Sequence, residues 1–158
     1  MNKETFNDLI SFEYPDGFNK LSNEENEKFF TGDLMRLSFH NPEKHIIFSL
    51  SKSKDSFIYW LCSVATVVSN SLSNLESTLK DFEVIEEYKS TIFNQSSITE
   101  CFSYTASDDG SKQYGELSVF KIKKAFYVVY CLSRFEDKEN SKRIFKQLKE
   151  SFTSVDEN

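Results

Sequence analysis

The sequence predicts an α+β fold, a three-layer α/β/α sandwich with a mainly antiparallel central sheet. Three observations favour it. Three successive strand-like segments lie between residues 98 and 133, and tight turns join them. The last segment, Ala125 to Ser133, is apolar on both faces, so both faces must be covered. Two helices with apolar stripes, over residues 56–82 and 138–152, are available as covers.

Length and charge limit the function classes. A chain of 158 residues without an evident linker or internal repeat predicts a single domain over residues 1–158. Its 25 acidic and 19 basic residues give a formal charge of −6, which argues against a nucleic-acid groove and against docking to an anionic membrane. The most apolar stretch, Phe57 to Val68, is shorter than the roughly 20 residues that span a bilayer. Because Met1 to Ile10 has no apolar core, we expect no signal peptide and a cytoplasmic location.

The N-terminal segment begins with an expected strand over residues 9–14. Pro15-Asp16-Gly17 then supplies a fixed φ, an acceptor side chain and a residue free to adopt positive φ, which is the chemistry of a turn. Ser22 and Glu25 have the spacing of a capping box, in which each side chain accepts from the other residue's backbone N–H. They predict a short helix that ends near Thr31-Gly32.

Two strands and a long helix are expected next. The strands are Met35 to His40 and His45 to Ser51, and the second is apolar on both sides, as in the interior of a sheet. The helix over residues 56–82 carries one apolar stripe with steps of three and four residues, formed by Phe57, Leu61, Val64, Val68, Leu72, Leu75, Leu79 and Phe82. Whether it is one helix or two stays open, because Ser69-Asn70-Ser71 is a candidate break before a second capping box at residues 73–76.

The C-terminal half has the clearest pattern. Residues 83–93 leave room for one short strand, and the strands around Ile98 to Thr105 and Tyr114 to Ile122 are joined by an Asp108-Asp109-Gly110 turn. The closing helix, Lys138 to Phe152, buries an apolar stripe. Its solvated face is expected to hold Lys142, Arg143, Lys146 and Lys149.

This order of elements resembles the PsbP-like α/β/α sandwich family, which includes the PsbP subunit of photosystem II, a Ran-binding import factor, DcrB-type proteins and Eag-type chaperones. The residues that carry the resemblance are Phe12 to Phe18 (FEYPDGF), Phe102 to Thr105 (FSYT), Gly115 to Lys121 (GELSVFK), Phe126-Tyr127 and Leu148 to Phe152 (LKESF). The family shares no catalytic set, so the resemblance implies a small, non-enzymatic domain that binds other proteins.

Motifs of catalysis and cofactor binding are missing from the sequence. No Gly-rich phosphate loop and no Gly-x-Ser-x-Gly elbow occur among its 4 glycines. His40 and His45 bracket a turn near Glu43, a set that could hold zinc, but no third dependable ligand is identifiable, so we expect no metal and no cofactor. Asp108-Asp109-Gly110 lacks the further ligands of a calcium loop.

Carboxylate pairs and cysteines give no stronger signal. The pairs Glu24-Glu25 and Glu86-Glu87 are adjacent in sequence rather than converging on a cleft, so we expect no acid–base catalysis from them. Three cysteines in no CxxC spacing, Cys62, Cys101 and Cys131, indicate buried free thiols. The sequence therefore predicts no catalytic residue and no enzyme.

Tyr59 and Trp60 are the candidate binding residues, because they lie off the apolar stripe of their helix. Two interpretations stay open. This half of the helix is buried on more than one side, or the two side chains form a protruding patch that contacts a partner. The nearby Lys121, Lys123 and Lys124 are expected to be solvated, although a basic patch on an acidic protein could steer an acidic partner.

Together these observations predict a bacterial-type, non-enzymatic domain that binds another protein as an adaptor, chaperone or immunity-type partner. One alternative is a cone-shaped α+β domain, ligand-binding or isomerase-like, with an apolar cavity lined by Phe and one carboxylate. Another is a structural homodimer built through residues 57–68. Neither nucleic acid nor a membrane is an expected partner.

Overall fold

The computed structural model describes residues 1–25 and 35–157. Its main sheet has seven antiparallel strands in the order β3-β4-β5-β9-β8-β7-β6. Their bounds are Asn19–Lys20 (β3), Met35–Asn41 (β4), Ile46–Lys52 (β5), Lys80–Ile92 (β6), Gln95–Thr105 (β7), Lys112–Ile122 (β8) and Ala125–Arg134 (β9). A smaller sheet combines β1 (Asn2–Phe6), β2 (Ile10–Tyr14) and β10 (Thr153–Ser154).

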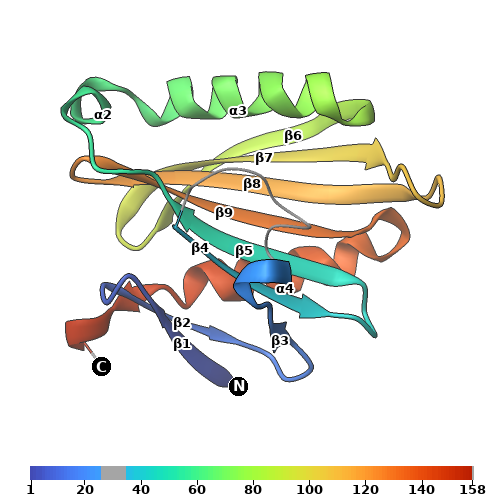
Figure 1. The fold of residues 1–158 in the computed structure, drawn as a ribbon, viewed down its shortest axis with the longest axis horizontal. Helices are drawn as coiled ribbons and strands as arrows, with labels where there is room; N and C mark the ends of the chain where they lie inside the picture. Colours follow the sequence, from blue (N-terminus) through green and yellow to red (C-terminus); the bar gives the residue numbers. More distant parts are fainter. Residues whose placement is uncertain (26–34, 158) are drawn as a thin grey trace.

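Helices lie on both faces of the main sheet (Figure 1). They are α2 (Phe57–Leu61), α3 (Val64–Thr78) and α4 (Lys138–Glu150), with short 3₁₀ turns at Phe135–Asp137 and Val155–Glu157. Helix α3 packs over β6, β7 and β8, whereas α4 and the smaller sheet lie against the opposite face. The strand β9 is therefore enclosed, with Val128 packed in the α3 layer and Val129 in the α4 layer. The predicted three-layer α+β sandwich is confirmed.

Four strands differ from the sequence prediction. Strand β1 and the two-residue strands β3 and β10 were not expected, and β6 is 13 residues long instead of one short strand. Among the described residues, β6 is the last strand of the sheet and pairs only with β7, and most of its side chains are exposed. An edge strand exposed on both faces has no apolar alternation, which is why its pattern was weak.

The helix expected over residues 56–82 is two helices, and the break lies at Cys62-Ser63. Ser63 caps α3, since its hydroxyl oxygen accepts from the backbone N–H of Thr66 at 3.1 Å. The candidate break at residues 69–71 was wrong, because these residues and the supposed capping box at 73–76 lie inside α3. The stripe holds only in part, since Phe57 and Leu61 are exposed and Phe82 belongs to β6.

Several local predictions are confirmed. The Ser22 hydroxyl accepts from the Glu25 N–H at 3.2 Å and the Glu25 carboxylate accepts from the Ser22 N–H at 3.0 Å, as in a capping box. The predicted end of that helix near Thr31-Gly32 lies outside the described residues. Strands β7 to β9 and the closing helix occur where the pattern placed them, and Phe145 and Leu148 are buried.

Candidate functional site

Helix α2 consists entirely of apolar side chains, none of which is buried. Phe57, Ile58, Tyr59, Trp60 and Leu61 are 71%, 68%, 36%, 53% and 75% exposed. Burial stabilises a side chain of this size by roughly 1.5–3 kcal/mol, and Phe57, Ile58 and Leu61 forgo most of that gain. The interpretation that this half of the predicted helix is buried on several sides was wrong.

The backbone of α2 is nevertheless held in place. At its N-terminus the Ser56 hydroxyl accepts from the Ile58 N–H at 3.2 Å. At its C-terminus the Lys121 ammonium donates to the carbonyls of Tyr59, Trp60 and Cys62 at 3.2, 2.9 and 2.8 Å. A cation there adds a donor to carbonyls at the end of the helix, of which that of Tyr59 also accepts from the Cys62 N–H, and it opposes their partial negative charge. Strand β8 thus fixes the helix that presents these side chains.

The two candidate residues Tyr59 and Trp60 also touch the sheet. The Tyr59 ring packs edge-on against Phe126, with centroids 5.6 Å apart, and the Lys124 ammonium lies 5.9 Å from the Trp60 ring centroid. The other three side chains, Phe57, Ile58 and Leu61, are the most exposed of the helix. Sequence reasoning missed Phe57 and Leu61, because their spacing continues the stripe that packs against the sheet in α3, and it did not single out Ile58.

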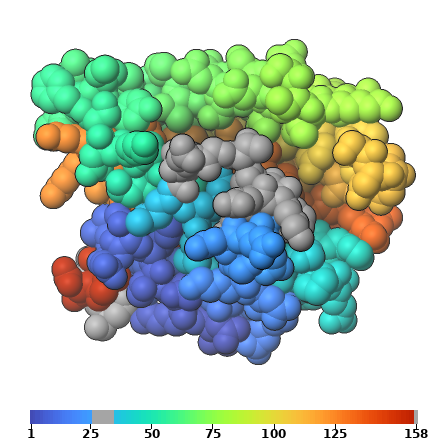
Figure 2. Space-filling model, in the orientation of Figure 1, coloured from blue at the N-terminus to red at the C-terminus, as the bar shows by residue number. Residues whose placement is uncertain are grey.

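Lysines surround α2. The segments 52–62 and 121–125 hold five lysines and one aspartate in a chain of charge −6. Lys54, Lys123 and Lys124 are exposed, and in the described part of the chain no carboxylate lies within ion-pair distance of them. Figure 2 shows α2 and the β8–β9 turn side by side at one end of the molecule. We call Phe57–Leu61 together with these three lysines the α2 surface.

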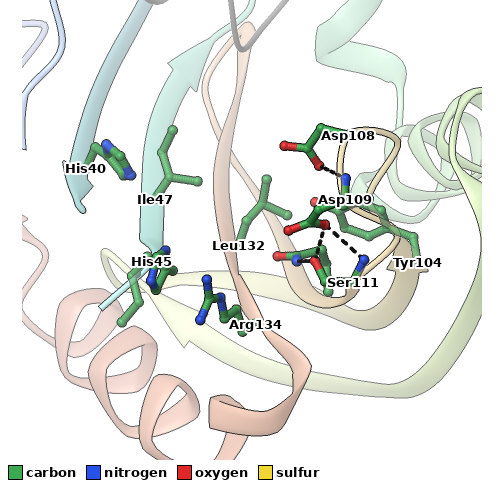
Figure 3. A pocket seen from close by; sticks show the side chains of 12 residues that line it. His40, His45, Ile47, Tyr104, Asp108, Asp109, Ser111, Leu132 and Arg134 are labelled. Carbon is green, nitrogen blue, oxygen red and sulfur yellow. Dashed lines mark hydrogen bonds between the residues drawn. The ribbon is translucent and has the colours of Figure 1, made fainter. Parts of the chain in front are cut away.

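The two histidines line a separate cavity of about 330 Å³. Figure 3 shows His40 and His45 on one side, the Asp108-Asp109 turn on the other, and Arg134 between them in this view. Glu43, the third group of the zinc hypothesis, is not among its lining residues. Within residues 1–25 and 35–157, no three His, Cys, Asp or Glu side chains are grouped so that they could hold a metal ion.

The aspartates at this cavity serve a turn, as the sequence predicts. The Asp109 carboxylate accepts from the Ser111 N–H at 2.9 Å and from the Ser111 hydroxyl at 2.6 Å, and Gly110 has a φ of +72°. These hydrogen bonds lower the pKa of Asp109. The carboxylate is thus engaged by its own turn.

A buried ionic network lies under α4 and was not predicted. The Lys149 ammonium donates to Glu116 Oε1 at 2.9 Å and to the Tyr88 hydroxyl at 2.9 Å, while the Tyr114 hydroxyl donates to Glu116 Oε2 at 2.7 Å. The side chains of Lys149 and Glu116 are 8% and 4% exposed, so the expectation of a solvated Lys149 was wrong. Burial alone would lower the pKa of Lys149, but the adjacent Glu116 carboxylate raises it above its ordinary value.

The cysteines next to this network are buried thiols. Burial raises the pKa of Cys101 to about 11 and raises that of Cys131 further, so both are protonated at neutral pH. Cys62 is half-buried, and all three are free. The expectation of buried free thiols is met at Cys101 and Cys131.

One acidic pair was missed by the sequence analysis. Glu87 and Glu100 face each other across β6 and β7, and Glu100 is 2% exposed. Burial, together with the hydrogen bond and charge of Glu87, raises the pKa of Glu100 to about 7. The two residues are 13 positions apart in sequence, and the pairing of β6 with β7 places them opposite each other. The sequence pattern did not define β6, so it could not predict this pair.

Glu100 makes stability depend on pH. The folded chain holds this proton up to about pH 7, whereas an unfolded chain releases it near the ordinary value of 4.5, so stability falls as pH rises between the two. Glu100→Gln should raise the free energy of unfolding at pH 8 by about 2 kcal/mol and change it little at pH 5. Urea unfolding at both pH values checks this, with Glu83→Gln on the neighbouring strand β6 as control. An equal effect at the two pH values would contradict the assignment.

Comparison with known proteins shows the fold. No family model and no curated protein sequence matches the chain. Cyanobacterial PsbP (CyanoP) from Synechocystis superposes with a TM-score of 0.71 at 14% identity, over 98% of this chain and 92% of that one. The protein of unknown function PA94 from Pseudomonas aeruginosa gives 0.60 at 14%, over 93% and 92%. LpqN of Mycobacterium tuberculosis, involved in cell envelope biogenesis, gives 0.56 at 16%, over 92% and 82%.

These similarities define the class of structure. The chain has a PsbP-like fold, and at these identities the similarity concerns the fold alone. In the part of the chain that the structure describes, no helix combines the length and hydropathy needed to cross a membrane. What the protein binds must be argued from its own surfaces.

Proposed function

We propose that this protein is a non-enzymatic binding domain, of adaptor, chaperone or immunity type, that holds another protein through the α2 surface. The observation that carries the proposal is a helix of five consecutive apolar residues, all at least 36% exposed, on a backbone fixed at both ends. Tyr, Trp and Phe are the side chains that dominate binding energy at protein interfaces, and a fixed backbone reduces the entropy lost on binding.

The partner's surface should be acidic. Lys54, Lys123 and Lys124 are exposed next to α2, and no carboxylate of the described chain lies within ion-pair distance of them, so negative charge around an apolar depression would complement them. A second copy docking through the same surface would bring these lysines against themselves. A bilayer is less suited, because helices that lie in a membrane interface present a long apolar face and α2 has only five residues.

Site-specific photo-crosslinking tests the proposal. A benzophenone side chain at Ile58 should give a discrete adduct with another protein in cells of the source organism. The same group at Glu139, which is exposed on α4, should not. Lys123→Glu combined with Lys124→Glu should abolish the adduct if negative charge attracts the partner.

Three outcomes would contradict the proposal. An adduct with twice the mass of the chain would indicate a homodimer. An adduct that still forms when Lys123 and Lys124 are both replaced by glutamate would show that the partner's surface is not acidic. No adduct, together with co-sedimentation of the protein with vesicles of anionic phospholipid but not of phosphatidylcholine, would make the partner a membrane.

A further inference from the structure

A cavity of about 440 Å³ opens between α4 and the β6–β8 end of the sheet, and it shares no residue with the α2 surface. Its inner wall is formed by Tyr88, Ile92, Cys101, Tyr114, Glu116, Lys142 and Lys149. The volume lies within the ordinary range of small-molecule sites. The phenylalanine-lined cup considered as an alternative function is filled instead, since Phe12, Phe39, Phe48 and Phe120 are packed core residues.

At the base of the cavity, the Glu116 carboxylate accepts a hydrogen bond at each of its two oxygens. Lys149 and the Tyr114 hydroxyl occupy the two oxygens of Glu116. The Tyr88 oxygen accepts from Lys149, so the Tyr88 O–H can still donate into the cavity.

Lys142 supplies an uncompensated positive charge. It is half-buried, its ammonium lies 5.7 Å from the Tyr114 ring centroid, and no carboxylate of the described residues is within 4.0 Å of it. At the mouth, Lys146 and Glu150 form an exposed pair at 3.9 Å, and the exposed Glu86 on β6, opposite Cys101, lines the cavity. The inner wall therefore holds two ammonium groups, Lys142 and Lys149, and one carboxylate, Glu116.

We propose that this cavity binds a small organic monoanion, a carboxylate with an aromatic or branched apolar body. The carboxylate would accept from Lys142 and from the Tyr88 hydroxyl, and the body would lie against Ile92, Tyr114 and Cys101. One negative charge matches the one positive charge of the inner wall that Glu116 leaves uncompensated. The proposal concerns binding alone, and it is independent of the α2 surface.

Calorimetric titration with three compounds of equal size tests it. The wild-type protein should bind 3-phenylpropanoate, bind 3-phenylpropan-1-ol at least tenfold more weakly, and not bind 3-phenylpropylamine. Lys142→Ala should weaken binding of the acid by roughly ten- to a hundredfold, the effect of losing one charge-assisted hydrogen bond. Lys138→Ala is the matched control, because Lys138 lies on α4 over Phe135 and outside the cavity.

The proposal is overturned if the three compounds bind equally, if the acid does not bind at all, or if Lys142→Ala binds it as the wild type does. Circular dichroism verifies that the variant is folded, and Lys142→Gln, which keeps the aliphatic stem over the Tyr114 ring, replaces it if it is not. Loss of the Ile58 adduct would not affect this result, so the two proposals fail separately.

Discussion

Lys149→Met should lower the free energy of unfolding by about 3–5 kcal/mol, the largest effect that we expect from a single substitution. Methionine fills the space of the lysine stem but removes the ammonium group from Glu116. The carboxylate, 4% exposed in the folded chain, would then keep the Tyr114 hydroxyl as its one hydrogen-bond partner among the described residues. A buried charge without a countercharge costs several kcal/mol, because water cannot solvate it.

A double variant distinguishes the effect of an unpaired buried charge from the effect of the changed side-chain shape. Lys149→Met combined with Glu116→Leu removes both charges and should recover more than half of the lost stability, because no buried charge remains. Lys146→Met, on the same helix but in an exposed ion pair, should change stability by less than about 0.5 kcal/mol. Urea unfolding measures all three, and a cost below 1 kcal/mol for Lys149→Met would show that the pair is hydrated.

Gly115→Ala should cost about 2–3 kcal/mol, the second largest effect. A Cβ at this position of β8 would overlap the Phe102 ring and lie 3.0 Å from Leu132 Cδ2. Phe102 is fully buried, and the rings of Phe82 and Tyr130 lie 5.3 and 6.0 Å from it, so it has little room to move. The substitution therefore tests how tightly the α3 face of the sheet is packed.

Gly110→Ala is the matched control for this substitution. No atom lies within 4 Å of a Cβ there, and the only cost is the positive φ of +72°, about 1 kcal/mol. Thermal or urea unfolding compares the two variants. If Gly115→Ala costs no more than Gly110→Ala, the layer between the sheet and α3 is loosely packed and the sandwich is not as described.

The helices and strands that could be predicted are those in which buried residues recur with the period of a strand or of a helix. Strand β9 has apolar residues on both faces and lies inside the sheet, so its pattern and its position agree. Strand β6 has one neighbour and is mostly exposed, so no pattern marks it. The break before α3 depends on the single hydroxyl of Ser63, which a continuous apolar stripe concealed.

The candidate sites were less predictable, for two physical reasons. Hydropathy records that Phe57 and Leu61 are apolar, but whether they are covered depends on how far the sheet extends beneath α2. Glu116 and Lys149 are 33 positions apart, and only the packing of α4 on β8 brings them together. A signal was present in β8, where Glu116 lies on the same face of the strand as Tyr114 and Phe120, but a single strand does not reveal the countercharge of a buried carboxylate.

The most direct test of the central claim is the stability of a chain in which Phe57, Ile58 and Leu61 are all replaced by serine. These side chains are 68–75% exposed, so if they serve a partner the free energy of unfolding should change by less than about 1 kcal/mol, while the adduct formed by a benzophenone at position 59 is lost. A loss of 4 kcal/mol or more in urea unfolding would mean that α2 belongs to the core of this chain and would contradict the claim.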